Sequence, residues 1–356
     1  MRVALIGPPF SGKTTLFRAV AEAGGSHVDV ARADQPHLAV VKVPDERLTW
    51  LGELYKPKKL TPAELEFLDL PGLDLSDEAA RAKSRQHWAA MRQSDMLAMV
   101  VRAFDDPSVP AYRNRVDAAA DAAELQAEML FADLDQVANR IERLQAQLRK
   151  PANRDATQRE LDLMLRLRQA LESEQPIRSA VRNSEEEKAI RSFAFLSIKP
   201  QLVVANCGED QASQTGADQV AGMEAMTLSA KIESELAQLA EQDRQAFLSD
   251  LGLISVARDR LIRACYRKLN LVSMFTVGED ECKAWTLPAG TEAVAAAGEI
   301  HTDIARGFIR AETMHYDDLR AARGETKAVK AAGKLRLEGK QYLVQDGDII
   351  NFRFNV

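Results

Sequence analysis

The chain has 356 residues, a formal net charge of -6 at pH 7 and a hydrophobic fraction of 46%. This length is too great for one compact core and predicts two or three domains, while the hydrophobic fraction excludes a disordered chain. The mild acidity argues against a protein that coats nucleic acid by bulk charge, although a local basic face is compatible with it.

The chain has an odd number of cysteines, Cys207, Cys265 and Cys282, and none of them forms a C-x-x-C motif. We therefore expect neither a disulfide framework nor a zinc site. Each is interpreted as a small buried residue in a reducing compartment. No apolar run reaches the ~18 residues that span a bilayer, and the chain starts almost directly on an expected strand, which leaves no room for a signal peptide. We therefore expect a soluble, cytoplasmic protein without a membrane partner.

Short apolar runs alternate with helical patterns in much of the chain. The run at residues 3–6 is wholly apolar, as a strand buried on both faces should be. Similar runs lie at residues 38–43, 65–68, 96–101 and 202–205. A helix is expected from Lys13 to about Ala23. Strands that alternate with helices indicate an α/β fold with a mostly parallel, doubly wound sheet.

The alternation stops near Asp117 and resumes near Ile198. In between, apolar residues spaced alternately four and three apart form a heptad seam, made of Leu130, Leu134, Val137, Ile141, Leu144 and Leu148. Residues 150–153 break this helix, and a second helix carries Leu161, Leu165, Leu167 and Leu171. We predict an inserted antiparallel, coiled-coil-like helical hairpin. It is interpreted as a rigid arm, with a partner surface on its charged outer faces as the alternative.

The C-terminal segment has a different character. Strands are expected at residues 273–277, 282–287, 341–344 and 349–354. Asp346 and Gly347 between the last two runs are a turn signal. This part is predicted to be a small α+β module. The predicted domains are therefore a discontinuous nucleotide-binding domain of residues 1–117 and 198–272, a helical arm of residues 118–197, and a C-terminal domain of residues 273–356.

Residues 7–14 fit the phosphate-loop pattern G-x-x-x-x-G-K-[ST] between an expected strand and an expected helix. The glycines let backbone amides turn inward around a β-phosphate, and the helix N-terminus adds partial positive charge. Lys13 would supply a cation to the β- and γ-oxygens, and the Thr14 hydroxyl would ligate Mg²⁺. The alternative is a glycine-rich turn without a ligand.

Asp69 and Gly72 lie at the end of a later strand. Asp69 can hold Mg²⁺ through a water, and the Gly72 amide can meet the γ-phosphate, although a plain turn would have the same sequence. Lys13 and Gly72 are thus the candidate catalytic groups, and Thr14 and Asp69 the candidate metal ligands. In Ras-like enzymes a glutamine that orients water follows this glycine, whereas Leu73 follows it here. We therefore expect slow hydrolysis.

The end of the strand near residue 205 carries a candidate base site. Guanine-specific enzymes have Asn-Lys-x-Asp at this place, and this chain has Asn206, Cys207, Gly208 and Glu209. Glu209 is one methylene longer than the aspartate that binds guanine, so guanine selection is not encoded in the usual way and adenine is admissible. Ser229 follows another short strand and could close over the base. A strand-end turn without a ligand is the alternative.

These motifs together resemble the YchF-type, Obg-like ATPases, a branch of the translation-factor-related P-loop NTPases that prefers ATP. The resemblance covers nearly the whole chain, including the helical hairpin. It rests on residues 7–14, 43–48, 56–59, 69–73, 204–209, 275–278, 283–286, 300–303, 307–312 and 334–356. The C-terminal part is similar to the family's ubiquitin-like TGS domain, a module associated with RNA and ribosome binding.

The resemblance implies ATP and Mg²⁺ as cofactors. It implies phosphate contacts from Phe10, Ser11, Gly12, Lys13, Thr14 and Thr15. It also places Asn206 and Cys207 in the adenine region. Together with Glu209 of the same motif and Ser229, which follows another short strand, they are the candidate base-site residues. The implied partner is the ribosome, through its large subunit, or RNA, contacted by the TGS-like domain and the helical arm. We expect a monomer.

Three departures from the family pattern affect the γ-phosphate region. Phe10 stands where the family usually has asparagine, Ala33 aligns with the threonine that reaches Mg²⁺, and residues 74–87 read as a polar helix in place of a glycine-rich run. Nucleotide binding should survive, because the cradle is backbone plus Lys13. A slow ATPase is expected, with a non-hydrolysing regulatory paralogue or a GTP-binding protein as alternatives.

Other polar residues are interpreted more simply. A basic cluster of Lys330, Lys334, Arg336 and Lys340 is either a solvated face or an RNA contact. His301 is interpreted as part of a polar turn and not as a catalytic or metal-binding group.

Overall fold

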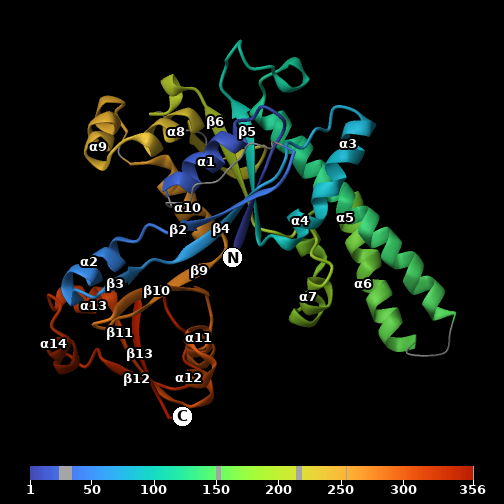
Figure 1. The fold of residues 1–356 in the computed structure, drawn as a ribbon. Helices are drawn as coiled ribbons and strands as arrows, with labels where there is room; N and C mark the ends of the chain where they lie inside the picture. The colour runs from blue at the N-terminus through green and yellow to red at the C-terminus, as the bar shows by residue number, and fades with distance from the viewer. Residues whose placement is uncertain (24–33, 150–153, 214–218, 254, 356) are drawn as a thin grey trace. The chain divides into compact units, whose positions relative to one another are not determined.

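The computed structural model describes residues 1–23, 34–149, 154–213, 219–253 and 255–355 (Figure 1). These residues form two compact units, one of residues 1–39 and 66–257 and the other of residues 40–65 and 258–356. The segments 40–65 and 258–272, which the sequence placed in the nucleotide-binding domain, therefore cluster with C-terminal residues.

A seven-stranded sheet forms the centre of the first unit, with the strand order β2-β4-β1-β5-β6-β8-β7. Its strands are β1 (Arg2–Ile6), β2 (His37–Lys42), β4 (Glu64–Asp69), β5 (Met96–Ala103), β6 (Gln201–Cys207), β7 (Gln219–Val220) and β8 (Met223–Leu228). β1 pairs in parallel with β4 and β5, β6 pairs in parallel with β5 and β8, and β7 is antiparallel to β8. The five predicted strands and the mostly parallel sheet are confirmed.

The central strands are covered on both faces. Val3, Ala4, Leu5 and Ile6 of β1 are all fully buried, which explains why this run is wholly apolar. The helices of this unit outside the helical arm are α1 (Lys13–Ala23), α3 (Glu78–Ser84), α4 (Trp88–Gln93), α8 (Ala230–Gln238) and α9 (Glu241–Asp250). Short 3-10 turns lie at Arg85–His87, Tyr112–Asn114, Ile177–Ala180 and Glu209–Gln211.

The predicted helical hairpin is present as α5 (Ala118–Leu148) and α6 (Arg154–Glu172), which lie side by side in Figure 1 and are followed by α7 (Ser184–Arg191). The predicted seam residues pack together with Ile190 and Phe195 in one apolar cluster. Outside the seam, Arg140 pairs with Glu160 through two hydrogen bonds of 2.7 and 2.8 Å. The predicted helix break at residues 150–153 lies outside the described residues.

A buried carboxylate fixes the base of this hairpin. Asp133 of α5 is fully buried, and it accepts hydrogen bonds from the backbone amides of Leu196 at 3.0 Å and Ser197 at 2.8 Å. The guanidinium of Arg92 donates a further bond at 3.0 Å. Because a buried charge must be paired and hydrogen-bonded, Asp133 ties α5 to the segment that leads into β6.

A six-stranded sheet forms the second unit, with the strand order β12-β11-β13-β9-β10-β3. Its strands are β3 (Lys59–Thr61), β9 (Leu271–Thr276), β10 (Glu281–Pro288), β11 (Phe308–His315), β12 (Arg336–Glu338) and β13 (Asp348–Phe354). Its helices are α2 (Glu46–Tyr55), α10 (Ala257–Lys268), α11 (Ala293–Ile300), α12 (Thr302–Arg306), α13 (Tyr316–Ala321) and α14 (Thr326–Ala331). The parallel pairing of β3 with β10 explains why residues 40–65 belong to this unit.

The prediction of a strand at residues 341–344 is wrong. Only an isolated bridge between Leu343 and Glu292 occurs there, and the nearby short strand is β12. The backbone groups have other partners, because the carbonyl of Tyr342 accepts from the amide of Ala293 at 2.7 Å and the amide of Val344 donates to Thr291 at 3.0 Å. The other three predicted strands of this module are confirmed, and Gly347 lies in a turn with φ +90°.

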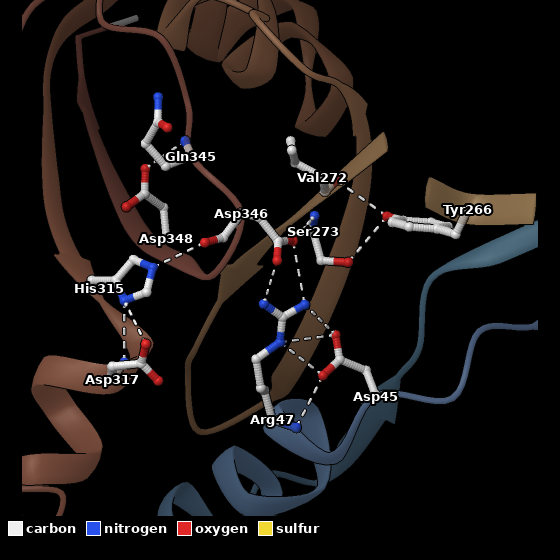
Figure 2. Close-up of polar contacts among 10 residues, drawn as sticks. All are labelled: Asp45, Arg47, Tyr266, Val272, Ser273, His315, Asp317, Gln345, Asp346 and Asp348. Atoms are coloured by element: carbon white, nitrogen blue, oxygen red, sulfur yellow. Dashed lines mark hydrogen bonds and ion pairs between the residues drawn. The ribbon is translucent and has the colours of Figure 1, made fainter. Parts of the chain in front are cut away.

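Figure 2 shows an ion-pair network inside the second unit, centred on Arg47 at the start of α2. Its guanidinium donates to both Asp45 and Asp346, and Asp346 also accepts from the backbone amide of Ser273 at 2.8 Å. Burial lowers the pKa of Arg47, but the hydrogen bonds with the two carboxylates outweigh it and raise the pKa above its ordinary value.

Several smaller expectations can be compared with the structure. All three cysteines are free and buried. His301 accepts a hydrogen bond from the amide of Asp303 at 3.2 Å and caps α12, as expected of a polar turn. In the part of the chain that the structure describes, no helix is both long and apolar enough to cross a bilayer.

Candidate functional site

The phosphate loop lies between β1 and α1, and its two glycines have close neighbours. A Cβ atom on Gly7 would lie 2.2 Å from the carbonyl oxygen of Val100. Gly12 has φ +83°, and a Cβ there would lie 2.1 Å from the side-chain nitrogen of Asn206. A side chain would clash at either place, and at Gly12 it would also be strained by the positive φ, so both positions favour glycine.

Three predicted residues meet at the start of α1. The Lys13 ammonium donates to Asp69 Oδ1 at 2.5 Å and also to the carbonyl of Leu70. The Thr14 hydroxyl donates to the other oxygen of Asp69, Oδ2, at 2.8 Å. Burial lowers the pKa of Lys13, and the adjacent Asp69 carboxylate opposes that shift.

Gly72 lies against the phosphate loop. A Cβ atom on Gly72 would stand 3.1 Å from Pro9, and the next amide, that of Leu73, donates to the carbonyl of Gly7 at 2.9 Å. The Leu73 side chain is buried in an apolar cluster with Leu70 and Leu75. The position that holds the water-orienting glutamine in Ras-like enzymes therefore faces the protein core here.

A cavity of about 600 Å³ surrounds the loop. Its lining residues are Pro8, Pro9, Phe10, Ser11, Gly12, Lys13, Thr14, Thr15, Asp34, Pro71, Gly72, Asp74, Ala80, Lys83, Ser84, Gln86 and His87. The Ser11 hydroxyl oxygen is buried and has no hydrogen-bond partner among the described residues. A buried polar atom of this kind calls for a polar ligand, so the loop fits a bound phosphate.

The residues also fit Mg²⁺, because the Thr14 hydroxyl and the Asp69 carboxylate supply adjacent oxygen ligands. Among the described residues, no three His, Cys, Asp or Glu side chains converge as a metal site. A magnesium ion held here would therefore take its remaining ligands from water and phosphate oxygens. Ala33, the predicted replacement of the switch threonine, lies outside the described residues.

A second cavity of about 530 Å³ is lined by the predicted base-site residues Asn206, Cys207, Glu209 and Ser229, together with Gly12, Thr15, Phe104, Asp105, Asp106, Val109, Gly208, Asp210, Ala230 and Lys231. The buried Asn206 side chain donates to the carbonyl of Ser11 at 2.9 Å and accepts from the amide of Ala230 at 2.9 Å. Asn206 thus holds the phosphate loop against the start of α8, and both ends of its amide are engaged.

Two charged groups of the second cavity pair with each other. Glu209 forms an ion pair of 2.5 Å with Lys231, so its carboxylate already has a cationic partner. Cys207 is buried, and burial raises the pKa of its thiol. Ser229 is buried at the N-terminal end of α8. All the predicted base-site residues therefore line one cavity.

Two residues at these cavities were missed by sequence reasoning. Arg102, at the end of β5, is buried and donates to the carbonyls of Phe104, Asp106, Val109 and Pro110. It therefore shapes the loop that forms one wall of the base cavity. The available signal was an arginine inside an otherwise apolar strand. The second residue, His87, is buried in the wall of the phosphate cavity.

Comparison with known proteins agrees with this geometry. Residues 2–138 match the family model described as "50S ribosome-binding GTPase", and residues 271–355 match the C-terminal YchF GTPase model, described as "Protein of unknown function". The Ribosome-binding ATPase YchF of Bacillus subtilis (strain 168) is 40% identical over 367 residues, which cover 100% of both chains. Its namesake in Escherichia coli O157:H7 is 36% identical over 365 residues, covering 100% of this chain and 99% of that one.

A solved structure, that of the Schizosaccharomyces pombe YchF GTPase, is 31% identical and covers 99% of this chain and 97% of its own. The TM-score of 0.87 confirms the α/β P-loop fold. Full-length identity to curated relatives confirms the resemblance seen in the sequence. The chain therefore belongs to the YchF family.

Proposed function

We propose that this chain is a slow ATPase that acts with the ribosome. The observation that supports it best is the phosphate loop, whose glycines have no room for a side chain and whose Ser11 hydroxyl is buried without a protein partner among the described residues. Backbone amides in such a loop bind polyphosphate, aided by the partial positive charge at the start of α1.

Lys13 would leave Asp69 and the Leu70 carbonyl to bind the β- and γ-phosphate oxygens. The Thr14 hydroxyl would bind Mg²⁺ directly and Asp69 would bind it through a water, while the Gly72 amide would meet the γ-phosphate. A bound Mg²⁺ neutralises charge on the phosphate oxygens. Phe10, Ser11, Gly12 and Thr15 complete the phosphate contacts in this proposal.

We propose ATP over GTP because the guanine-binding aspartate is replaced by Glu209, which is paired with Lys231 at 2.5 Å. Cys207, Asn206 and Ser229 would surround the adenine. The printed names of the relatives differ on this point, since the Bacillus subtilis protein is called an ATPase and the Schizosaccharomyces pombe protein a GTPase. GTP binding is therefore the competing proposal.

A calorimetric titration of ATP and GTP with Mg²⁺ present tests both binding and preference. We expect tighter binding of ATP. Lys13→Ala should abolish binding of either nucleotide, whereas Lys188→Ala, an exposed lysine on α7, should leave it unchanged. Equal or tighter binding of GTP would refute the ATP preference, and no heat with any nucleotide would refute the function itself.

A second candidate is a regulatory protein that binds nucleotide without turnover. The burial of Leu73 in the core favours it, because this side chain cannot orient a water at the γ-phosphate. Single-turnover hydrolysis with and without ribosomes separates the two candidates. Release of phosphate that Lys13→Ala abolishes supports the ATPase, and bound ATP that stays intact supports the regulatory protein.

We propose ribosome association because the Bacillus subtilis and Escherichia coli relatives are named ribosome-binding. The proposed contacts are the large subunit or its RNA, through the TGS-like domain and the helical arm of a cytoplasmic monomer. In the basic cluster, Lys334 pairs with Asp318 at 2.5 Å and Arg336 approaches Asp348 at 3.5 Å, so part of its charge is neutralised internally.

Lys330 and Lys340 are both exposed in this cluster and carry the RNA-contact proposal. Reversing both charges with Lys330→Glu and Lys340→Glu should weaken co-sedimentation with large subunits, and more so at low salt, because phosphate contacts release counterions. The same two reversals at Lys42 and Lys56, which are exposed and lie outside both the TGS-like domain and the arm, are the matched control for net charge. Equal effects would argue against a specific contact by the cluster.

A further inference from the structure

A buried histidine shares the phosphate cavity with Lys13 and Gly72. His87 lies in the 3-10 turn Arg85–His87, which follows α3 directly, and its side chain is only 8% exposed. Nothing in the phosphate-loop chemistry described above uses this residue. Its position therefore calls for an explanation in terms of the reaction at the γ-phosphate.

The imidazole of His87 is neutral at physiological pH. Burial lowers its pKa below the ordinary 6.5, and the positive charges of Lys13 and Lys83 lower it further. A neutral imidazole has one ring nitrogen that accepts a hydrogen bond. The wall of the cavity thus contains an uncharged acceptor close enough to Lys13 to feel its charge.

The acceptor nitrogen can be identified from its neighbour. The side-chain amide nitrogen of Gln86 lies 3.2 Å from His87 Nε2, and because an amide nitrogen only donates, Nε2 accepts. Gln86 is exposed, so its amide can bond to solvent instead. A water in the cavity can then take the place of this amide at Nε2.

Other polar groups of the cavity wall are less suited to this role. Asp74 accepts from the amide of Ser76 at 3.0 Å, and a carboxylate beside a triphosphate is repelled by it; the same repulsion applies to Asp34. The hydroxyl of Ser84 already donates to the carbonyl of Asp74 at 3.0 Å. The Ser11 hydroxyl is assigned to the phosphate contacts, and unlike a hydroxyl, a neutral imidazole can also take up a proton near pH 7. His87 is therefore the described residue of this wall that best combines burial, neutrality and a proton-accepting atom.

We propose that His87 orients the water that attacks the γ-phosphate, a role that rests on the proposed ATPase function. The water oxygen forms a bond to the γ-phosphorus as the bond from that phosphorus to the bridging oxygen breaks. The nucleoside diphosphate leaves with the bridging oxygen and its electron pair. One water proton passes by way of His87 Nε2 to the released phosphate. His87 thus performs the water-orienting role that the apolar side chain of Leu73 cannot perform.

Two substitutions separate this role from packing. His87→Phe keeps an aromatic ring but removes the accepting nitrogen, whereas His87→Gln supplies a carbonyl oxygen as acceptor. We expect His87→Phe to bind ATP with an affinity within about threefold of wild type and to lower the single-turnover rate roughly 100-fold, as loss of general-base assistance does. His87→Gln should recover at least about tenfold of that rate. Arg85→Ala is the matched control, because Arg85 is an exposed residue of the same 3-10 turn that does not line this cavity, and it should keep the rate within about threefold.

The binding titration tests whether the protein binds ATP, and the single-turnover rate tests whether it hydrolyses ATP. A wild-type protein that does not bind ATP, or that binds ATP but never hydrolyses it, refutes the proposed ATPase function. A wild-type protein that hydrolyses ATP leaves the function standing, and the variants then test the role of His87 alone. A folded His87→Phe protein with the wild-type rate overturns the role, and so does a His87→Gln protein no faster than His87→Phe. Thermal melting checks folding, and if His87→Phe melts early, His87→Leu replaces it as the variant without an acceptor.

Discussion

Arg47 and Asp346 are joined by two hydrogen bonds although 299 positions separate them in the chain. The distances are 2.7 Å from Nη1 to Oδ2 and 3.3 Å from Nη2 to Oδ1 (Figure 2). Asp45 accepts from the same guanidinium at 2.9 Å and 2.8 Å. The network therefore fastens the start of α2, which follows β2 closely in the chain, to the turn before β13 inside the second unit.

Asp346→Ala should lower the free energy of unfolding by about 2 kcal/mol. The substitution removes hydrogen bonds to a charged group and leaves the amide of Ser273 without its acceptor, and the half-exposed carboxylate reduces the loss. Urea unfolding monitored by tryptophan fluorescence measures this loss of stability, because Trp50 and Trp285 both lie in the second unit.

Asp280→Ala is the matched control for that substitution. Its ion pair with Lys58 also joins residues 40–65 to the C-terminal residues, but the two side chains are 82% and 85% exposed. We expect it to cost less than about 0.5 kcal/mol. If both alanine variants lose the same stability, the Arg47 network contributes no more than a solvated ion pair.

Gly12→Ala should reduce ATP affinity at least about tenfold. The new Cβ would lie 2.1 Å from the Asn206 amide, which holds the phosphate loop against α8, and φ +83° strains any other residue. Calorimetry measures the affinity. Gly333→Ala is the control, because it has φ +72° with no described atom within 4 Å; it should cost about 1 kcal/mol of stability and leave affinity unchanged. An unaltered affinity in Gly12→Ala would show that the loop tolerates the clash.

The sequence predicts best those features that depend on short stretches of the chain. The run at residues 3–6, the spacing of the phosphate loop and the heptad seam each specify a local structure, and each is present. The strand expected at residues 341–344 failed because its backbone bonds to Thr291 and Ala293, far away in the sequence. Pattern alone gives no information about such partners.

In the candidate site, too, local motifs could be predicted and contacts between distant residues could not. The meeting of Lys13, Thr14 and Asp69 follows from motifs at the ends of adjacent strands. Arg102 and His87 had no motif, because their roles depend on which carbonyls and charges surround them after folding. Likewise the motif around Asn206 predicts a base contact but gives no sign of the hydrogen bonds of its amide to Ser11 and Ala230, which are 195 and 24 positions away.

Tyr342 gives the second unit a measurable response to alkaline pH. Burial raises the pKa of Tyr342 to about 12, and its hydrogen bond of 2.7 Å to the Asp348 carboxylate adds to the effect. The unfolded chain titrates near pH 10. Because the folded state holds the proton more tightly, this stabilisation is complete below about pH 10 and is lost as the pH rises towards 12.

Stability measured against pH should therefore fall more steeply between about pH 10 and 12 in the wild type than in Tyr342→Phe, by on the order of 1 kcal/mol. The difference in ultraviolet absorbance between the two proteins should show a phenolate that forms near pH 12 and not near pH 10. Arg336 stacks on the ring at 5.3 Å, and its charge lowers this pKa. Arg336→Gln should consequently shift the phenolate titration to still higher pH. A shift to lower pH would mean that Arg336 does not act on the phenol through its charge.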